Sequence, residues 1–106
     1  MGKQDNAEDE HRRYKLLSVR GLTPTERKRL YKMQGGIDPI DGKTYDIDEM
    51  QAHHIRPVYA GGETKLGNMV LLSAENHRRY HYEGICTAEQ LKEKYEALVQ
   101  KNGYVK

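Results

Sequence analysis

The sequence predicts a small α+β fold with two N-terminal helices, a β-hairpin, two further short strands, a helix and a C-terminal helix. Two capping boxes, at 23–26 (Thr-Pro-Thr-Glu) and 87–90 (Thr-Ala-Glu-Gln), each mark the start of a helix. Between them lies the strongly apolar run 68–72 (Asn-Met-Val-Leu-Leu), which is typical of a short buried strand. Helix starts near both ends of the chain, with strand patterns between them, therefore predict the α+β class.

The N-terminal third is expected to be helical after a short leader. Residues 1–6 are expected to be disordered. Residues 7–19 predict a helix with acidic residues in its first turn and basic residues later, which suits the helix dipole. The second helix is expected over residues 24–34, and Gly35-Gly36 should end it.

The middle of the chain predicts the strands. Residues 37–47 suggest a hairpin closed at Asp41-Gly42, a dipeptide suited to the positive backbone dihedrals of a tight turn. Residues 50–58 predict a strand that ends or bends at Pro57, and residues 68–72 predict the next strand. A loop that contains Gly61-Gly62 should connect these two strands.

The C-terminal part predicts two helices. Ser73 is expected to cap a helix that is broken near Gly84. Thr87 opens a final helix of about 13 residues, in which apolar side chains recur at the spacing of a core-facing stripe. These side chains are Leu91, Tyr95, Leu98 and Val99.

The composition allows one small domain, which we expect to span residues 7–106. Apolar residues make up 36% of the 106, with no Trp and no Phe, so a bound metal ion would add useful folding free energy. The single cysteine, Cys86, excludes an intramolecular disulfide and a cysteine-based zinc site, and we expect it to pack as a small apolar side chain. No run of about 18 apolar residues and no secretory signal is present, which predicts a soluble cytoplasmic protein without a membrane partner.

Basic residues concentrate near the N-terminus, although the net charge is only +2. Residues 11–32 hold eight Lys or Arg and one acidic residue, whereas residues 33–52 hold one Lys and five acidic residues. A concentrated basic segment is typical of a surface that binds a polyanion, but a solvated helix face has the same composition. The charge pattern leaves both interpretations open.

Four of the five histidines form two close pairs, His53-His54 and His77 with His81. On a helix, residues four apart lie one above the other, so two imidazole nitrogens can reach one metal ion. A third imidazole from the preceding strand would complete three protein ligands and leave positions open for water or phosphate, as in a catalytic site.

His53 and His54 are expected to have different tasks. Adjacent strand residues point to opposite faces, so both can approach one phosphate only if the strand ends or twists between them. One imidazole would then face the metal ion and the other a nucleophilic water. A neutral imidazole with a pKa near its usual value of about 6.5 can accept that water's proton.

The stretches around these histidines resemble the HNH endonuclease family and its ββα-metal (His-Me finger) fold. The resemblance covers about residues 35–83, with the core motif at 48–83, and extends to the branch of colicin DNase toxins, phage nucleases and intron- or restriction-associated nucleases. The segments that carry it are Asp48 to Pro57, Gly61-Gly62, Asn68 to Leu72 and Asn76 to His81.

The resemblance implies roles for individual residues. His53, His77 and His81 would be the ligands of one divalent metal ion. His54 would be the general base that activates water, and Asn68 would bond the loop and hold the base in orientation. The implied reaction is hydrolysis of DNA phosphodiester bonds to 5′-phosphate and 3′-hydroxyl ends, with the metal ion stabilising the phosphorane and the leaving 3′ oxygen.

The sequence departs from the family pattern at two places. Where many members carry Cys-x-x-Cys pairs for a structural zinc, this chain has Asp38-Pro39-Ile40-Asp41 and no second pair, so no structural zinc is expected. A hard cation bound by the two aspartates is the less favoured alternative. Many members also use Asp where His53 stands, so the site is expected to be all imidazole. Zinc, nickel, manganese or cobalt suit it better than magnesium.

Basic residues near the motif are expected to contact DNA phosphates, without sequence specificity and with a steep dependence on salt. The nearest are Arg56, Lys65, Arg78 and Arg79, and a wider patch would include Arg12, Arg13, Arg20, Arg27, Lys28, Arg29 and Lys32. No recognition helix and no aromatic platform for stacking bases stands out. Tyr59, Tyr80 and Tyr82 are expected at the core and rim.

The competing interpretation is a non-catalytic nucleic-acid-binding module in which a metal ion held by histidines is structural and His54 is incidental. A toxin domain with a cognate inhibitor protein is a third. The sequence leaves open the setting, whether phage or other mobile element, restriction system or bacterial competition. It also leaves open a homodimer or larger parent complex, nicking against double-strand cleavage, and DNA against RNA.

Overall fold

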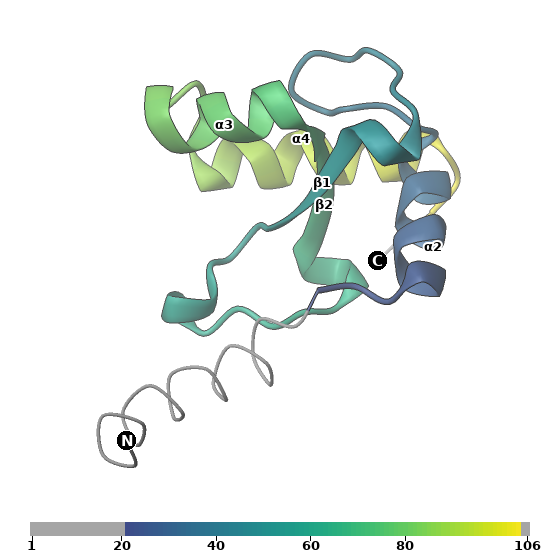
Figure 1. Cartoon of the computed structure of the whole chain (residues 1–106), viewed down its shortest axis with the longest axis horizontal. Coiled ribbons are helices and arrows are strands. Elements are labelled where there is room, and N and C mark those ends of the chain that lie inside the picture. Colours follow the sequence, from purple (N-terminus) through teal and green to yellow (C-terminus); the bar gives the residue numbers. More distant parts are fainter. Residues whose placement is uncertain (1–20, 105–106) are drawn as a thin grey trace, which may run out of the picture.

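The computed structural model describes residues 21–104, and the expected leader and first helix lie outside them. The elements are helix α2, strands β1 and β2, and helices α3 and α4 (Figure 1). Their bounds are α2 Pro24–Gln34, β1 Met50–His54, β2 Met69–Ser73, α3 Ala74–Glu83 and α4 Ala88–Lys101. Strand, strand and helix follow in that order from β1 to α3, so the α+β class and the ββα order are confirmed.

Both capping boxes form as predicted. The Thr23 hydroxyl accepts a hydrogen bond from the Glu26 N–H at 3.1 Å, and the Glu26 carboxylate accepts one from the Thr23 N–H at 2.9 Å. Thr87 and Gln90 repeat the arrangement at the start of α4, with distances of 3.0 and 2.9 Å. Gly35 ends α2 with φ 63°, the left-handed conformation that favours glycine.

The two strands pair antiparallel, with Met50 opposite Ser73 and His54 opposite Met69. The strand expected over residues 50–58 is shorter than predicted: β1 ends at His54, and a 3-10 turn, Val58–Ala60, follows Pro57. Proline lacks the N–H that a further ladder bond would need. Another 3-10 turn, Leu66–Asn68, leads into β2.

The hairpin expected over residues 37–47 forms as a short turn closed at Asp41-Gly42, without two regular strands. Only one bridge forms, between Ile37 and Thr44, around a turn in which Gly42 has φ 72° as the turn requires. The physical reason is Asp38, which is fully buried. Its carboxylate accepts hydrogen bonds from the Ile40 N–H within the turn and from the Ser73 N–H at the end of β2, so the side chain points into the domain interior.

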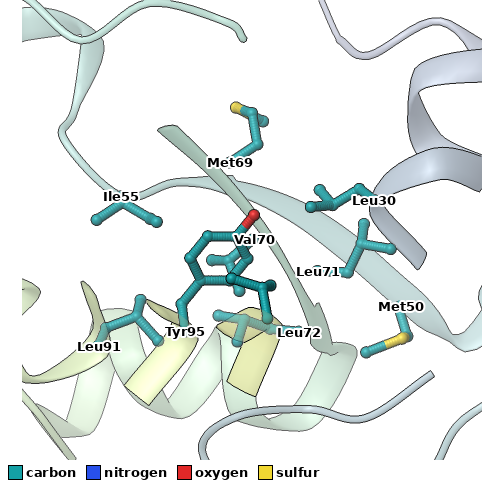
Figure 2. Packing of buried hydrophobic residues seen from close by; sticks show 10 residues of the cluster. Leu30, Met50, Ile55, Met69, Val70, Leu71, Leu72, Leu91 and Tyr95 are labelled. Carbon is teal, nitrogen blue, oxygen red and sulfur yellow. The ribbon is translucent and has the colours of Figure 1, made fainter. Parts of the chain in front are cut away.

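The core is built around β2, all five residues of which are buried. Figure 2 shows Leu30 of α2 beside Leu71 on one side of the strand, and Leu91 and Tyr95 of α4 on the side of Val70. Met50 and Ile55 extend this cluster. None of the helices in the described part of the chain is long and apolar enough to cross a membrane.

A side chain from α2 completes the hydrogen bonding along β2. Gln34 is fully buried, and its amide accepts from the Leu71 N–H at 2.7 Å and donates to the Leu71 carbonyl at 2.9 Å. These bonds satisfy backbone groups that β1, on the other edge of β2, cannot reach.

Candidate metal centre

Three imidazoles from two elements converge on one point. His53 comes from β1 and His77 and His81 come from α3, and one ligand atom of each lies within 4.8 Å of the others. The His53 ring centroid is 5.2 Å from the centroids of both the His77 and His81 rings. The i, i+4 spacing on α3 places His77 Nε2 3.1 Å from His81 Nε2. The structure therefore gathers the three residues expected as ligands.

His53 is the most buried of the three. Its side chain is 8% exposed, and its Nε2 atom is buried without a hydrogen-bond partner, an arrangement that ordinarily costs about 1–3 kcal/mol. Burial, then the neighbouring His77, His81 and His54, lower its pKa to about 4. The ring is thus neutral at physiological pH and carries lone pairs, as a metal ligand must. A divalent cation bound by the three rings would satisfy the orphaned nitrogen, so the residues fit the expected ion.

A hydrogen bond from β1 orients His77. Nδ1 of His77 lies 2.7 Å from Oε1 of Gln51, and since an amide oxygen only accepts, Nδ1 carries the proton and Nε2 the lone pair. Burial and the nearby His81 lower the pKa of His77. Gln51 was not among the predicted site residues, although its position two residues before His53 places both on one face of β1.

Tyr80 of α3 closes one side of the cluster. Its ring packs edge-on against His53 with a centroid distance of 4.7 Å, and burial raises the pKa of its phenol. Cys86 lies nearby as a partly buried side chain packed on the core, as expected. The Tyr80 ring thus covers part of the His53 ring.

His54 lies beside the cluster and outside it. It is the last residue of β1, and it lines an open cavity of about 520 Å³ together with His53, His77 and His81. Because the strand ends at His54, both members of the adjacent pair reach one cavity. Its Nε2 lies 2.8 Å from the Thr64 hydroxyl, and burial lowers its pKa.

Asn68 joins both ends of the loop that follows His54. Its side-chain oxygen accepts from the Arg56 N–H at 2.8 Å. Its amide group donates to the carbonyls of Arg56 at 3.1 Å and Glu63 at 2.9 Å. This contact with the loop agrees with the bonding pattern that the resemblance implied.

Gly62 permits this closure, which sequence reasoning did not foresee. A Cβ atom built on Gly62 would lie 1.7 Å from the Arg56 carbonyl oxygen and 2.9 Å from Asn68 Nδ2. No side chain fits there, because the two backbones are already in contact.

The sequence comparison agrees with this geometry. Residues 38–83 match the HNH endonuclease family. The matched segment, called the HNH segment below, contains every residue of the histidine cluster together with His54 and Asn68. Its family is one of endonucleases, so the segment has a nuclease-type, nucleic-acid-related character. No curated protein sequence matches the chain significantly.

At the start of the HNH segment are the aspartates that stand in place of the family's cysteine pair. Asp38 accepts from the Ser73 N–H at 2.8 Å and from the Asn76 side-chain amide at 2.9 Å. The same amide donates to Asp41 at 2.9 Å, and Tyr45 donates its hydroxyl to Asp41 as well. We call Asp38, Asp41 and Asn76 the polar knot. It holds the first turn of α3, one residue before His77.

Hydrogen bonds stabilise the charged carboxylate of Asp41 in the polar knot. Burial would raise the pKa of Asp41, but bonds from Tyr45, the Lys43 backbone and Asn76 lower it overall. Among the described residues, no second group of three His, Cys, Asp or Glu side chains has metal-ligand spacing. The expectation that no structural zinc is needed stays a prediction.

The four basic residues expected to contact DNA nearest the motif are engaged with nearby groups. Arg56 Nε donates to the Ala60 carbonyl at 2.7 Å, which ties its guanidinium to the loop. The other three form exposed ion pairs: Lys65–Glu63 at 3.5 Å, Arg78–Glu75 at 3.7 Å, Arg78–Glu83 at 3.9 Å and Arg79–Glu83 at 3.2 Å. Exposed pairs contribute only about 0–1 kcal/mol, so a phosphate can compete for these cations.

One member of the wider basic patch, Arg27, holds two elements of the fold together. The Arg27 side chain donates to the carbonyls of Ile47 and Met50, and so fastens α2 to the chain that enters β1. Arg12, Arg13 and Arg20 lie outside the described residues. Their contact with DNA stays a prediction, as does that of Lys28, Arg29 and Lys32.

Proposed function

We propose that this protein is a metal-dependent endonuclease that hydrolyses DNA phosphodiester bonds. The observation that carries the proposal is that four histidines line one cavity, three of them as a cluster and the fourth beside it. Three imidazoles converge to ligand distance, and the fourth, His54, lines the same cavity with the hydroxyl of Thr64 as its partner.

His53, His77 and His81 would hold one divalent cation. Zinc, nickel and manganese suit this imidazole set, and magnesium is also to be tested. The ion, when bound, supplies Lewis-acid stabilisation of the charge that develops on the phosphoryl group and the leaving oxygen. The chain contributes neutral, oriented rings: burial keeps His53 unprotonated, and Gln51 fixes the tautomer of His77.

His54 takes the proton of the attacking water. When Nε2–H of His54 donates to the Thr64 hydroxyl, Nδ1 carries the lone pair and acts as the base. Burial lowers the pKa of His54, which keeps the ring neutral and competent at physiological pH. Thr64 would therefore position the base.

The loop between β1 and β2 holds these parts in place. Asn68 bonds the backbone of Arg56, two residues after His54, and Gly62 allows the loop to close over that backbone. A rigid support matters because a displacement of about 1 Å can cost a hundredfold in rate.

The test is nicking of supercoiled plasmid with Mg²⁺, Mn²⁺, Ni²⁺ or Zn²⁺, with and without a chelator. We expect metal-dependent nicking, a loss of at least about a hundredfold in His54→Ala, and metal binding unchanged in that variant. The fifth histidine offers a matched control, because His11→Ala removes an imidazole outside residues 38–83, the segment that matches the HNH family.

Two results would contradict the mechanism. Equal nicking by the wild type and His54→Ala removes His54 from the reaction. DNA binding without nicking under any of the four metal ions supports the non-catalytic binding module instead.

A further inference from the structure

The most exposed large hydrophobic side chain among the described residues lies at the histidine cavity. Tyr59 is 90% exposed and lines the cavity together with His53 and His54. A bare aromatic ring at this place gives up the free energy that burial would provide. The proposed hydrolysis makes no use of it.

The backbone beneath Tyr59 is tightly bonded. The ring projects from the turn Val58–Ala60, in which the Pro57 carbonyl accepts from the N–H groups of Ala60 and Gly62, each at 2.9 Å. Arg56 Nε bonds the Ala60 carbonyl, and Asn68 bonds both backbone groups of Arg56. Figure 1 shows the connection between β1 and β2, which carries this turn, extending away from α2.

A rigid turn that holds an exposed aromatic ring beside a phosphate-directed site is suited to stacking. Base–aromatic stacking requires that one face of the base is uncovered, and in a continuous duplex neighbouring bases cover both faces. An isolated tyrosine gives no sequence pattern of its own, which explains why no stacking platform was expected from the sequence.

We propose that Tyr59 stacks on an unpaired nucleobase next to the scissile phosphate. The preferred substrate is then DNA with an unstacked base at the cleavage position, such as a single strand or a mismatched bubble. This inference rests on the proposed endonuclease function, because that function places the phosphate in the cavity.

The test measures binding of the full chain in chelator, where no hydrolysis occurs. Three fluorescein-labelled DNAs are compared by anisotropy: a duplex, the same duplex with a central two-nucleotide mismatched bubble, and the single strand. We expect Tyr59→Ala to weaken binding of the bubble and the single strand by about tenfold and to change duplex binding little.

Control variants separate stacking from general effects. Tyr59→Phe keeps the ring and should bind like the wild type. Tyr82→Ala removes another highly exposed tyrosine, 82% exposed on α3, that does not line the cavity, and should also bind like the wild type. Circular dichroism melting verifies that each variant is folded.

Three outcomes overturn the inference: unchanged binding of all DNAs by Tyr59→Ala, an equal loss on duplex and bubble, or an equal loss in Tyr82→Ala. Failure of the proposed function looks different. If the wild type nicks no DNA with any metal ion but Tyr59→Ala still weakens bubble binding, the stacking proposal stands and the endonuclease proposal fails. If nicking depends on His54 but Tyr59→Ala has no effect on binding, the endonuclease proposal stands and the stacking proposal fails.

Discussion

Gln51 of β1 and His77 of α3 are joined by a hydrogen bond of 2.7 Å that crosses from the sheet to the helix. The bond selects the His77 tautomer whose Nε2 faces His81. Partners of this kind beyond the metal ligands typically change metal affinity about 10–100-fold when they are removed.

Gln51→Ala should therefore weaken Zn²⁺ or Ni²⁺ binding by about tenfold, measured by isothermal titration calorimetry. Gln51→Glu retains an acceptor oxygen and should bind at least as tightly as the wild type. Because Gln51 is exposed, thermal stability without metal should change little. An unchanged dissociation constant in Gln51→Ala would show that the bond does not orient the ligand.

Stability without metal should fall as the pH decreases from about 6.5 to about 4. The pKa of His53 is near 6.5 in an unfolded chain and about 4 in the folded protein. Between these values the unfolded state binds a proton at His53, whereas the folded ring stays unprotonated. Protons therefore favour unfolding, and His54 and His77, whose pKa values are also lowered, act in the same direction.

The measurement is urea unfolding in chelator at pH 7 and pH 5. His53 should contribute about 1–2 kcal/mol of the loss. His53→Gln should therefore lose less stability than the wild type over this range. If both proteins show the same loss, the folded-state pKa of His53 is not lowered.

Gly62→Ala should destabilise the fold, because the new Cβ would collide with the Arg56 carbonyl oxygen. We expect a loss of about 2–4 kcal/mol in the free energy of unfolding, together with loss of nicking. Gly67→Ala is the matched control, since a Cβ at Gly67 meets nothing within 4 Å. Similar stabilities for the two variants in urea titrations would mean that the close approach at Gly62 is relaxed in solution.

Asn76→Ala should be the most damaging change in the polar knot. It leaves the buried Asp38 with one hydrogen-bond donor fewer and removes the link to Asp41, at a cost of about 2–4 kcal/mol. Asn102→Ala also removes one amide hydrogen bond, to the Met33 carbonyl, but at an exposed position, and should cost only about 1 kcal/mol.

A second readout connects the polar knot to the metal site. Because the knot holds the first turn of α3, Asn76→Ala should also weaken metal binding by His77 and His81. If Asn76→Ala is destabilised but binds metal as tightly as the wild type, the polar knot stabilises the fold and does not position the histidines.

The sequence by itself determined the elements whose signals are local. Capping boxes at Thr23 and Thr87, the Ser73 cap and the glycine after α2 act within one turn of the backbone, so their positions can be read from neighbouring residues. The histidine spacing and the asparagine before β2 similarly predicted a resemblance to the HNH family, and residues 38–83 match that family.

Only the tertiary structure decided how distant segments meet. The buried Asp38 bonds the turn at residues 37–44 to Asn76 of α3, and Gln34 supplies hydrogen bonds to β2 from 37 residues away. The pairing of Gln51 with His77, the exclusion of any side chain at Gly62 and the exposure of Tyr59 likewise depend on which surfaces pack together. Such contacts leave no periodic pattern in the chain, because they depend on the relative placement of whole elements and not on the preferences of adjacent residues.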